Sequence, residues 1–147
     1  MAIKLTTKEA ETLISMLKKS AEESIELPNA SGRIQFNAVG TRRENQFTIN
    51  ISRKGINNSG ATFQGRESSN GNILVRLDVN PTAVHINPSD GTRIVGTHLH
   101  VYTEEYAMGQ AVSFDVGNKD LYELCYVFFE KFNLIEPPKV AYQQRLY

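Results

Sequence analysis

The sequence of 147 residues contains a single cysteine, Cys125, so no disulfide framework can form within the chain. It has no apolar run near the ~18 residues that a membrane span needs. Its N-terminus lacks the long apolar region of a secretory signal, and no internal repeat, linker or low-complexity segment is present. We therefore expect a soluble, cytoplasmic protein that folds as a single domain over residues 1–147 and does not enter a membrane.

The chain has no net charge, but its charges are unevenly distributed. The stretch from Arg33 to Arg93 holds eight basic and four acidic residues, and seven of the eight cations are arginine. Arginine suits bidentate contacts with phosphate, so this stretch favours a nucleic-acid partner, although a solvated mixed-charge surface has the same composition. The residues that we expect to bind RNA are Arg42, Arg43, Arg53 and Arg66.

The middle of the chain alternates between apolar and polar residues, as a half-buried strand does. Three runs carry this pattern: Ile34, Phe36 and Ala38; Phe47, Ile49 and Ile51; and Ile73, Val75, Leu77 and Val79. Clusters of Gly, Asn and Ser separate the runs, one of them at 55–60. The pattern predicts an antiparallel, meander-like sheet of about five to seven strands over residues 33–116.

Helical patterns flank this stretch. Thr6 and Glu9 form a capping box, which predicts a helix over about 7–24. A second, amphipathic helix is expected over about 119–133, capped by Asn118 and followed by an extended tail at 137–147. Its apolar stripe consists of Leu121, Leu124, Cys125, Phe128, Phe129 and Phe132, which makes Cys125 a core residue and not a nucleophile. The fold class is therefore α+β, with a helix at each end of the sheet.

All three histidines of the chain, His85, His98 and His100, fall within sixteen residues. Strand periodicity puts His98, His100 and Tyr102 on one face and Leu99 and Val101 on the other. In the preceding strand, Arg76 and Asp78 point away from the apolar face. If the two strands are neighbours, one sheet face carries all of these polar groups. A solvated face with an exposed Arg–Asp ion pair would give the same pattern.

One chemistry that such a face can support is metal-free cleavage of RNA, which needs a general base, a general acid and a cation for the transition state. His98 and His100 suit the acid and base roles near neutral pH. Arg76 is the fork-shaped donor, Asp78 can hold the tautomer of one imidazole, and Tyr102 can stack on a base. His85 is a further candidate, and this mechanism requires no cofactor and no metal.

The other chemistry is metal binding. A His-x-His pair on a strand presents two imidazoles on one side, and His85 or Glu104 would supply a third ligand. The segment approaches the cupin signature, because Glu104 and Gly109 follow the two histidines. However, the glycine spacings differ from that signature, and its downstream proline-glycine and histidine motif is missing.

Two families share short motifs with residues 73–105. One resemblance is to the pattern of TumE-like ribonuclease toxins from toxin–antitoxin modules, and the residues that carry it are Arg76-Leu77-Asp78-Val79-Asn80-Pro81, His85 and Thr97-His98-Leu99-His100. Together with Asn87-Pro88-Ser89-Asp90-Gly91 and Tyr102, they resemble more closely the core of a little-characterised family of bacterial and phage proteins. Two departures from the toxin pattern are the segment 81–84, where the toxins have paired histidines, and Thr97, where they have proline.

The likeness implies a small toxin-like ribonuclease, from a bacterium or a phage, that acts on RNA and is neutralised by an antitoxin. An alternative from another class is a non-catalytic counter-defence inhibitor, similar in role to anti-CRISPR proteins, that binds a host defence protein. A third is a small metal- or ligand-binding domain. The sequence leaves open whether the chain forms a homo-oligomer.

Overall fold

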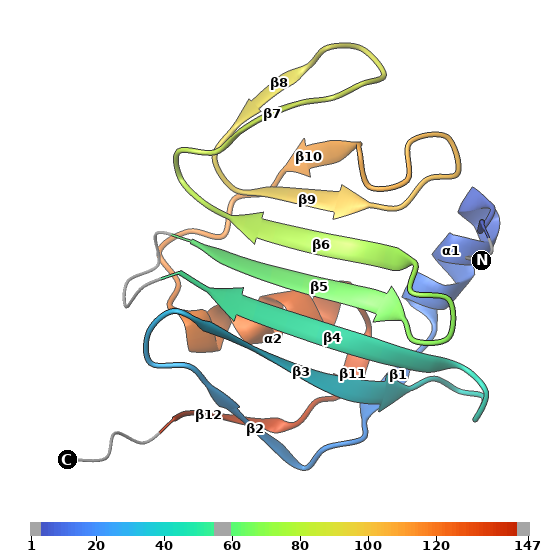
Figure 1. Cartoon of the computed structure of the whole chain (residues 1–147), viewed down its shortest axis with the longest axis vertical. Helices are drawn as coiled ribbons and strands as arrows, with labels where there is room; N and C mark the ends of the chain where they lie inside the picture. The colour runs from blue at the N-terminus through green and yellow to red at the C-terminus, as the bar shows by residue number, and fades with distance from the viewer. Residues whose placement is uncertain (1–3, 55–59, 144–147) are drawn as a thin grey trace.

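A computed structural model describes residues 4–54 and 60–143, which form an α+β fold as expected (Figure 1). The elements are α1 (Thr7–Ser15), β1 (Lys18–Ser20), β2 (Ser24–Leu27), β3 (Gly32–Val39), β4 (Gln46–Arg53), β5 (Ala61–Glu67), β6 (Ile73–Val79), β7 (Val84–Ile86), β8 (Arg93–Val95), β9 (His98–Val101), β10 (Ala111–Ser113), α2 (Leu121–Lys131), β11 (Leu134–Glu136) and β12 (Lys139–Tyr142). Within the described residues, neither helix is long and apolar enough to cross a membrane. Most of the loop predicted at 55–60 lies outside the described residues, as does the end of the tail at 144–147.

The main sheet has eight strands in the order β10-β9-β6-β5-β4-β3-β1-β11, which exceeds the predicted five to seven. The central strands β3 to β6 form the expected antiparallel meander, and β9 and β10 continue it beyond β6. The β7–β8 hairpin is inserted between β6 and β9. The extra strands lie at the other edge, where β1 pairs with β3 and takes β11 as a parallel neighbour.

The first helix is shorter than predicted, although its capping box is confirmed. The backbone N–H of Glu9 donates to Thr6 Oγ1 (3.0 Å), and that of Thr6 donates to Glu9 Oε1 (2.9 Å). The helix ends at Ser15 and not near residue 24, because the backbone leaves helical geometry at Met16, where ψ is 133°, and the side chain of Lys18 is buried in the core. Its ammonium group donates to the carbonyls of Ile14, Met16 and Phe132, so the chain leaves the helix and enters the sheet.

The second helix agrees closely with its predicted range, but its cap is Asp120 instead of Asn118. Asp120 lies two residues closer to the apolar stripe than Asn118 does, and its side chain accepts from the backbone N–H of Glu123 at 2.8 Å. Every residue of that stripe is buried, including Cys125, which is 0% exposed. The tail is extended as expected, and residues 139–142 form a parallel pair with β2.

The apolar sides of the central strands pack against α2, which lies behind the sheet in Figure 1. Phe63 stacks on Phe128 with ring centroids 5.8 Å apart. Phe47 meets Phe132 edge to face at 5.7 Å. Gly65 permits this close approach, because a Cβ atom there would lie 2.7 Å from the Phe132 ring. Most of the hydrophobic core therefore lies between the sheet and α2.

The opposite side of the same strands is polar, because residues directly across an antiparallel pair point to the same side. In one row of partners, Arg33, Ser52, Thr62, Asp78 and His98 follow one another from β3 to β9. A second row contains Gln35, Asn50, Gln64, Arg76 and His100, and a third contains Asn37, Thr48 and Arg66. We call these thirteen residues the polar face. No helix lies in front of its central strands in Figure 1.

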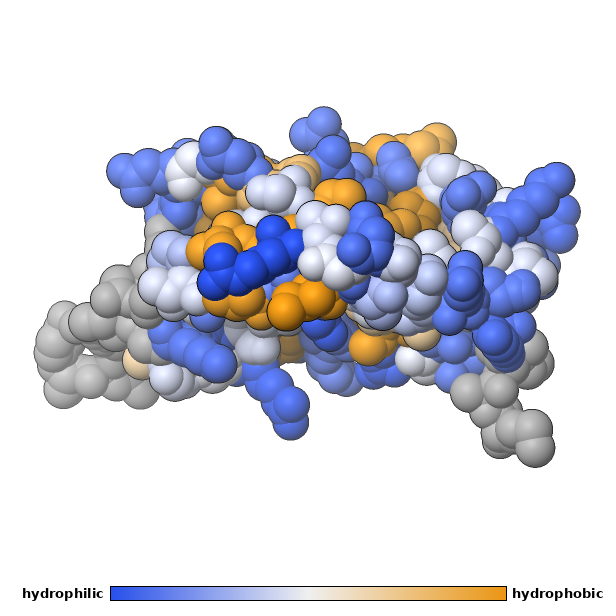
Figure 2. Space-filling model, turned by 90° about the horizontal axis from the view of Figure 1, so that it is seen from above, coloured by the Kyte–Doolittle hydropathy of each residue, from blue (hydrophilic) through white to orange (hydrophobic). Residues whose placement is uncertain are grey.

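Apolar side chains are also exposed at one end of the sheet, over β7, β8 and β10. Val84, Val95 and Val112 are 53%, 56% and 59% exposed, and Ile86 is 60% exposed. Val84 and Val95 are cross-strand partners, and Val95 and Val112 line the same shallow groove. Figure 2, which looks onto this end, shows hydrophobic atoms gathered around a hydrophilic side chain. We call these four residues the apolar end.

Candidate active site

The two motif-bearing strands are neighbours, which is the condition under which their polar residues were expected to share a face. Strands β6 and β9 pair antiparallel, with Arg76 opposite His100 and Asp78 opposite His98. Leu99, between the two histidines, is 8% exposed and belongs to the core, as expected. Val101 pairs with the buried Val75 and so lies on the same side as Leu99, as expected, but it is 38% exposed at the end of the strand and lies outside the core.

The four polar side chains form one network around the carboxylate of Asp78. Arg76 lies 3.1 Å from Asp78 (Nη2 to Oδ2), and its Nε also donates to this carboxylate. The Nε2 atoms of His98 and His100 lie 3.4 and 3.3 Å from Asp78 Oδ2. Arg76 Nη2 is also 3.1 Å from His100 Nε2. The Asp78 carboxylate therefore has a guanidinium and two imidazoles within hydrogen-bonding distance.

Backbone carbonyls orient both imidazole rings. His98 Nδ1 lies 2.8 Å from the carbonyl of Gly96, and His100 Nδ1 lies 2.7 Å from that of Met108. A carbonyl only accepts hydrogen bonds, so each Nδ1 carries a proton and each Nε2 is turned toward Asp78. In a neutral ring His100 Nε2 carries a lone pair and can accept from Arg76, and when the ring takes a second proton the same atom can donate to Asp78. His98 Nε2 faces the carboxylate and can donate to it only when its ring also carries a second proton. The two histidines thus have different hydrogen-bonding roles.

The carboxylate of Asp78 remains ionised in this setting. Burial raises its pKa, but the hydrogen bond with His100 and the charge of Arg76 outweigh burial, so the pKa lies below its ordinary value. The side chain is 21% exposed, compared with 6% for His98 and 2% for His100. At neutral pH Asp78 therefore carries a negative charge that can stabilise a proton on either imidazole.

The third histidine joins the other two from the β7–β8 hairpin. The ring of His85 stacks on His98 with centroids 5.4 Å apart and meets His100 edge-on at 4.9 Å. His85 Nε2 lies 2.8 Å from the carbonyl of Gly109 and 3.1 Å from Asn87 Oδ1. His85 therefore packs beside the network, but neither Asp78 nor Arg76 is among its hydrogen-bond partners.

The Asn87-Pro88-Ser89-Asp90-Gly91 motif attaches this hairpin to the sheet. The side chain of Asn87 donates to the carbonyl of Ala111 and accepts from its N–H, at 2.9 and 2.8 Å, as a neighbouring strand would. Gly91 has a φ of +74°, which favours glycine in the turn of the hairpin. The motif thus has a structural task, which is to hold His85 over the other two rings.

The structure places Tyr102 apart from the network. Its side chain is 5% exposed, and its hydroxyl donates to the carbonyl of Leu5 at 2.8 Å, beneath the N-terminal segment. The tyrosine follows the end of β9, where strand alternation no longer governs its surroundings. Because its hydroxyl already has this partner, we leave Tyr102 out of the candidate site.

The four arginines expected to bind RNA do not converge. Arg66 lies on the polar face, where its Nε donates to Asn50 Oδ1 at 3.4 Å. Arg53 lies on the opposite side of β4 and donates to the carbonyl of Pro28, and Arg42 and Arg43 are exposed between β3 and β4. Sequence spacing could not show this, because the face of the sheet that each side chain occupies depends on its position in the strand, and two of the four arginines lie in a turn.

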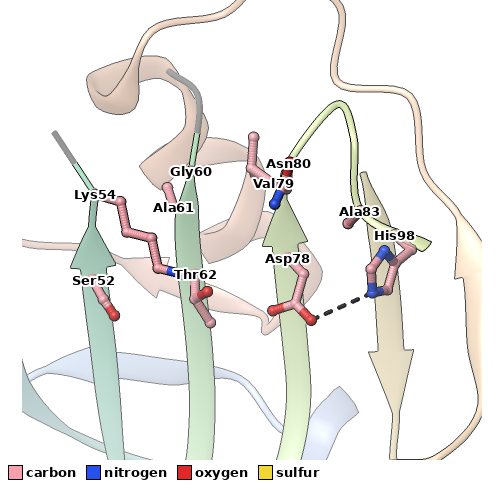
Figure 3. Close-up of a pocket in the computed structure, with 10 residues that line it drawn as sticks. All are labelled: Ser52, Lys54, Gly60, Ala61, Thr62, Asp78, Val79, Asn80, Ala83 and His98. Carbon is pink, nitrogen blue, oxygen red and sulfur yellow. Dashed lines mark ion pairs between the residues drawn. The ribbon is translucent and has the colours of Figure 1, made fainter. Parts of the chain in front are cut away.

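A cavity of about 220 Å³ opens beside the network. Figure 3 shows Ser52, Thr62, Asp78 and His98 side by side on four neighbouring strands, with Lys54 reaching toward Thr62. The cavity exposes one side of Asp78 and His98, whereas His100 does not line it. Sequence reasoning missed Ser52, Lys54 and Thr62. Their alternation with apolar residues was a signal, but it did not reveal their register with Asp78.

Among the described residues, the three histidines form the group that could hold a metal ion. One ring nitrogen from each of His85, His98 and His100 lies within 4.8 Å of the others, and Glu104 is not part of this group. The backbone carbonyls behind the rings resemble the outer shell of a metal centre. Arg76 opposes such an ion, because its guanidinium donates into the lone pair of His100 Nε2 and places a positive charge beside it. A metal would have to displace Arg76 to use all three rings.

Comparison with known proteins places the chain in a family without assigning an activity. No curated protein and no solved structure matches the chain. A family model, described as a family of unknown function (DUF6978), matches residues 5–134. This agrees with the likeness to a little-characterised family, whereas the likeness to TumE-like toxins stays a prediction. The chain belongs to the family of unknown function DUF6978.

Proposed function

We propose that the network of Arg76, Asp78, His98 and His100 is a metal-independent acid–base centre that cleaves RNA. The observation that carries this proposal is the convergence of both Nε2 atoms on Asp78, with Arg76 within 3.1 Å of the carboxylate and of His100. Transesterification of RNA needs two proton transfers and a cation for the charged phosphorane, and this network offers all three.

The different hydrogen bonds of the two histidines support different roles for them in this proposal. His100 Nε2 holds a lone pair toward Arg76 and acts as the base, and His98, which lines the cavity, acts as the acid. An incoming phosphate draws the Arg76 guanidinium away from His100, which frees that lone pair. Asp78 keeps both rings oriented and stabilises the protonated form of each.

The proton and electron transfers balance as follows. The 2′-hydroxyl gives its proton to His100 Nε2, and its oxygen forms a new bond to phosphorus. The bond between phosphorus and the 5′-oxygen breaks, and that oxygen takes the proton from His98 Nε2. The products are a 2′,3′-cyclic phosphate on one fragment and a 5′-hydroxyl on the other. In a cellular setting, we propose that this activity is toxin-like and is held in check by a protein partner.

The test is cleavage of a single-stranded RNA oligonucleotide in the presence of EDTA, with the product ends identified by mass spectrometry. His98→Ala and His100→Ala should each reduce the rate by about 10²–10⁴-fold. The double variant should be little worse than either single variant, because residues that act as a unit are non-additive. Val101→Ala is the matched control on the same strand, since its side chain is 38% exposed and lies outside the network.

Three outcomes would contradict this function. The first is that the wild-type protein neither cleaves RNA nor arrests growth on expression. The second is that the folded histidine variants keep full activity. The third is that activity disappears with EDTA and returns when a transition metal is added. The last outcome would instead favour a metal centre on the three histidines.

The apolar end supports a second candidate, a non-catalytic protein that binds a partner such as a host defence protein. Exposed valines on β7, β8 and β10 are the kind of surface that a protein partner covers. In that case Val95→Asp should abolish the effect of the protein on growth, and His98→Ala should leave it unchanged. The acid–base proposal expects the loss in His98→Ala.

A further inference from the structure

We propose that the polar face is a track for single-stranded RNA that leads across β3, β4 and β5 into the candidate active site. This inference rests on the proposed function and extends it by naming the form of the substrate and the surface that holds it. It depends on a different observation, the register of five neighbouring strands, and on side chains outside the acid–base network.

The track is continuous because two rows of the polar face run without a break from β3 to β9. The row that ends at His98 begins at Arg33, four strands away, and passes through Ser52 and Thr62. Strands in a sheet are spaced by about 4.8 Å, so the row is about 19 Å long. At about 3.4 Å per stacked nucleotide, and more when the chain is extended, this length accommodates roughly three to six nucleotides.

The charge of the track suits a phosphate backbone. The polar face carries three arginines, Arg33, Arg66 and Arg76, and one acidic residue, Asp78. Lys54 adds a further cation where the track meets the cavity beside His98. These cations are spread along the sheet instead of being clustered, as a polyanion lying across the strands requires.

Between the arginines, amide and hydroxyl side chains are already held in place by hydrogen bonds with one another. Asn50 donates to Gln35 at 3.0 Å and accepts from Arg66 at 3.4 Å. Thr48 donates to Asn37 at 3.0 Å. Amide groups offer both donors and acceptors, so they can contact base edges and 2′-hydroxyls that a single strand exposes.

A single strand fits the chemistry better than a duplex. The attacking 2′-oxygen, the phosphorus and the leaving 5′-oxygen must come into line, and a flexible strand reaches that geometry more readily than a regular helix. The described residues of the polar face contain no Phe, Tyr or Trp. Recognition there depends on phosphate contacts and amide hydrogen bonds instead of base stacking.

The experiment measures binding without cleavage, using a fluorescent ten-nucleotide RNA whose 2′-positions are methylated so that no attack can occur. Wild-type protein should bind this strand in a salt-dependent way and should bind the corresponding duplex more weakly. The variant Arg33→Ala/Arg66→Ala should lose at least tenfold in affinity and show a shallower salt dependence, because two phosphate contacts are removed. Arg42→Ala/Arg43→Ala is the matched control, with the same change of charge off the track, and should stay within about twofold.

The track is overturned if the two double variants lose affinity equally, if the duplex binds more tightly, or if the strand does not bind at all. Cleavage of an unmodified strand is measured in parallel to separate the two proposals. Binding on the track without cleavage would contradict the acid–base function alone. Cleavage that is unaffected by Arg33→Ala/Arg66→Ala would contradict the track alone.

Discussion

The two faces of the main sheet come from the same strands but hold their side chains in place by different means. On the side of α2, aromatic rings such as Phe63 and Phe128 are 0% exposed and are fixed by packing. On the polar face, side chains such as Asn50 and Asp78 are partly exposed and are fixed by hydrogen bonds and charge. Packing is the larger source of stability, so the polar face is free to carry chemistry at little cost to folding.

The contrast should be clearest in unfolding experiments with alanine. Phe128→Ala should lower the free energy of unfolding by about 3–5 kcal/mol, since it leaves a cavity beside Phe63. Gln64→Ala, on the polar face of the same strand as Phe63, should change it by no more than about 0.5 kcal/mol. Denaturant unfolding measures both. Similar losses for the two variants would show that the polar face also supports the fold.

A single added methyl group tests how tightly α2 fits the sheet. Gly65→Ala should lower the free energy of unfolding by about 2–3 kcal/mol, because the new Cβ would lie 2.7 Å from the ring of Phe132. In a Phe132→Leu background the ring is absent, so the same substitution should cost much less. Equal costs in both backgrounds would mean that the strain comes from the backbone and not from this contact.

Lys18 brings a buried charge to the packed side of the sheet, so substituting it tests whether packing alone stabilises that side. Its ammonium group has three carbonyl acceptors and lies 4.2 Å from the Phe132 ring centroid. Lys18→Met should cost about 1–3 kcal/mol at pH 7, because it leaves those carbonyls without their donor. The side chain otherwise keeps its apolar contacts.

Burial also lowers the pKa of Lys18 to about 7. Between this value and about 10.5 the unfolded chain binds the proton and the folded chain does not, so wild-type stability should rise with pH. The Lys18→Met variant lacks this rise, and its deficit relative to wild type should grow from pH 7 to pH 10. Parallel stability curves would instead indicate that the carbonyls keep the ammonium group charged.

A smaller effect than at Lys18 is expected at Asp78, on the polar face. Its lowered pKa means that the unfolded chain takes up a proton first as the pH falls, so its stabilising contribution is present above about pH 4 and lost below. Asp78→Asn should cost about 1 kcal/mol at neutral pH. The difference from wild type should shrink below pH 4 in acid unfolding curves. A constant difference down to pH 2 would argue against ionic contacts at this position.

Much of the fold was predictable because local patterns act over a few residues. The capping box at Thr6 and Glu9, the α2 stripe and most of the apolar alternation of the central strands were correctly predicted. The prediction was wrong at Ile73, because a register shift sets this residue opposite Arg66 and Leu74 is buried. The errors occurred where long-range contacts override local preference. Lys18 and Leu134 enter the sheet as partners of one another, although they are 116 positions apart.

The candidate site shows the same division. Alternation predicted that Arg76, Asp78, His98 and His100 would share a face if their strands paired, and that pairing is confirmed. Alternation also placed Tyr102 with them, but its hydroxyl instead bonds to Leu5, a residue far away in the sequence. The four arginines were grouped by composition, which carries no information about the face of a strand on which a side chain lies.

By itself, the sequence determined which residues are apolar or polar at each step of a strand, because side chains alternate with a fixed period of two. It therefore determined that the central sheet has one apolar and one polar face. Only the tertiary structure decided which polar residues are neighbours, since register depends on contacts between distant strands. It set Ser52 and Thr62 in line with Asp78 and His98, and it brought His85 over them through the hydrogen bonds of Asn87 with Ala111.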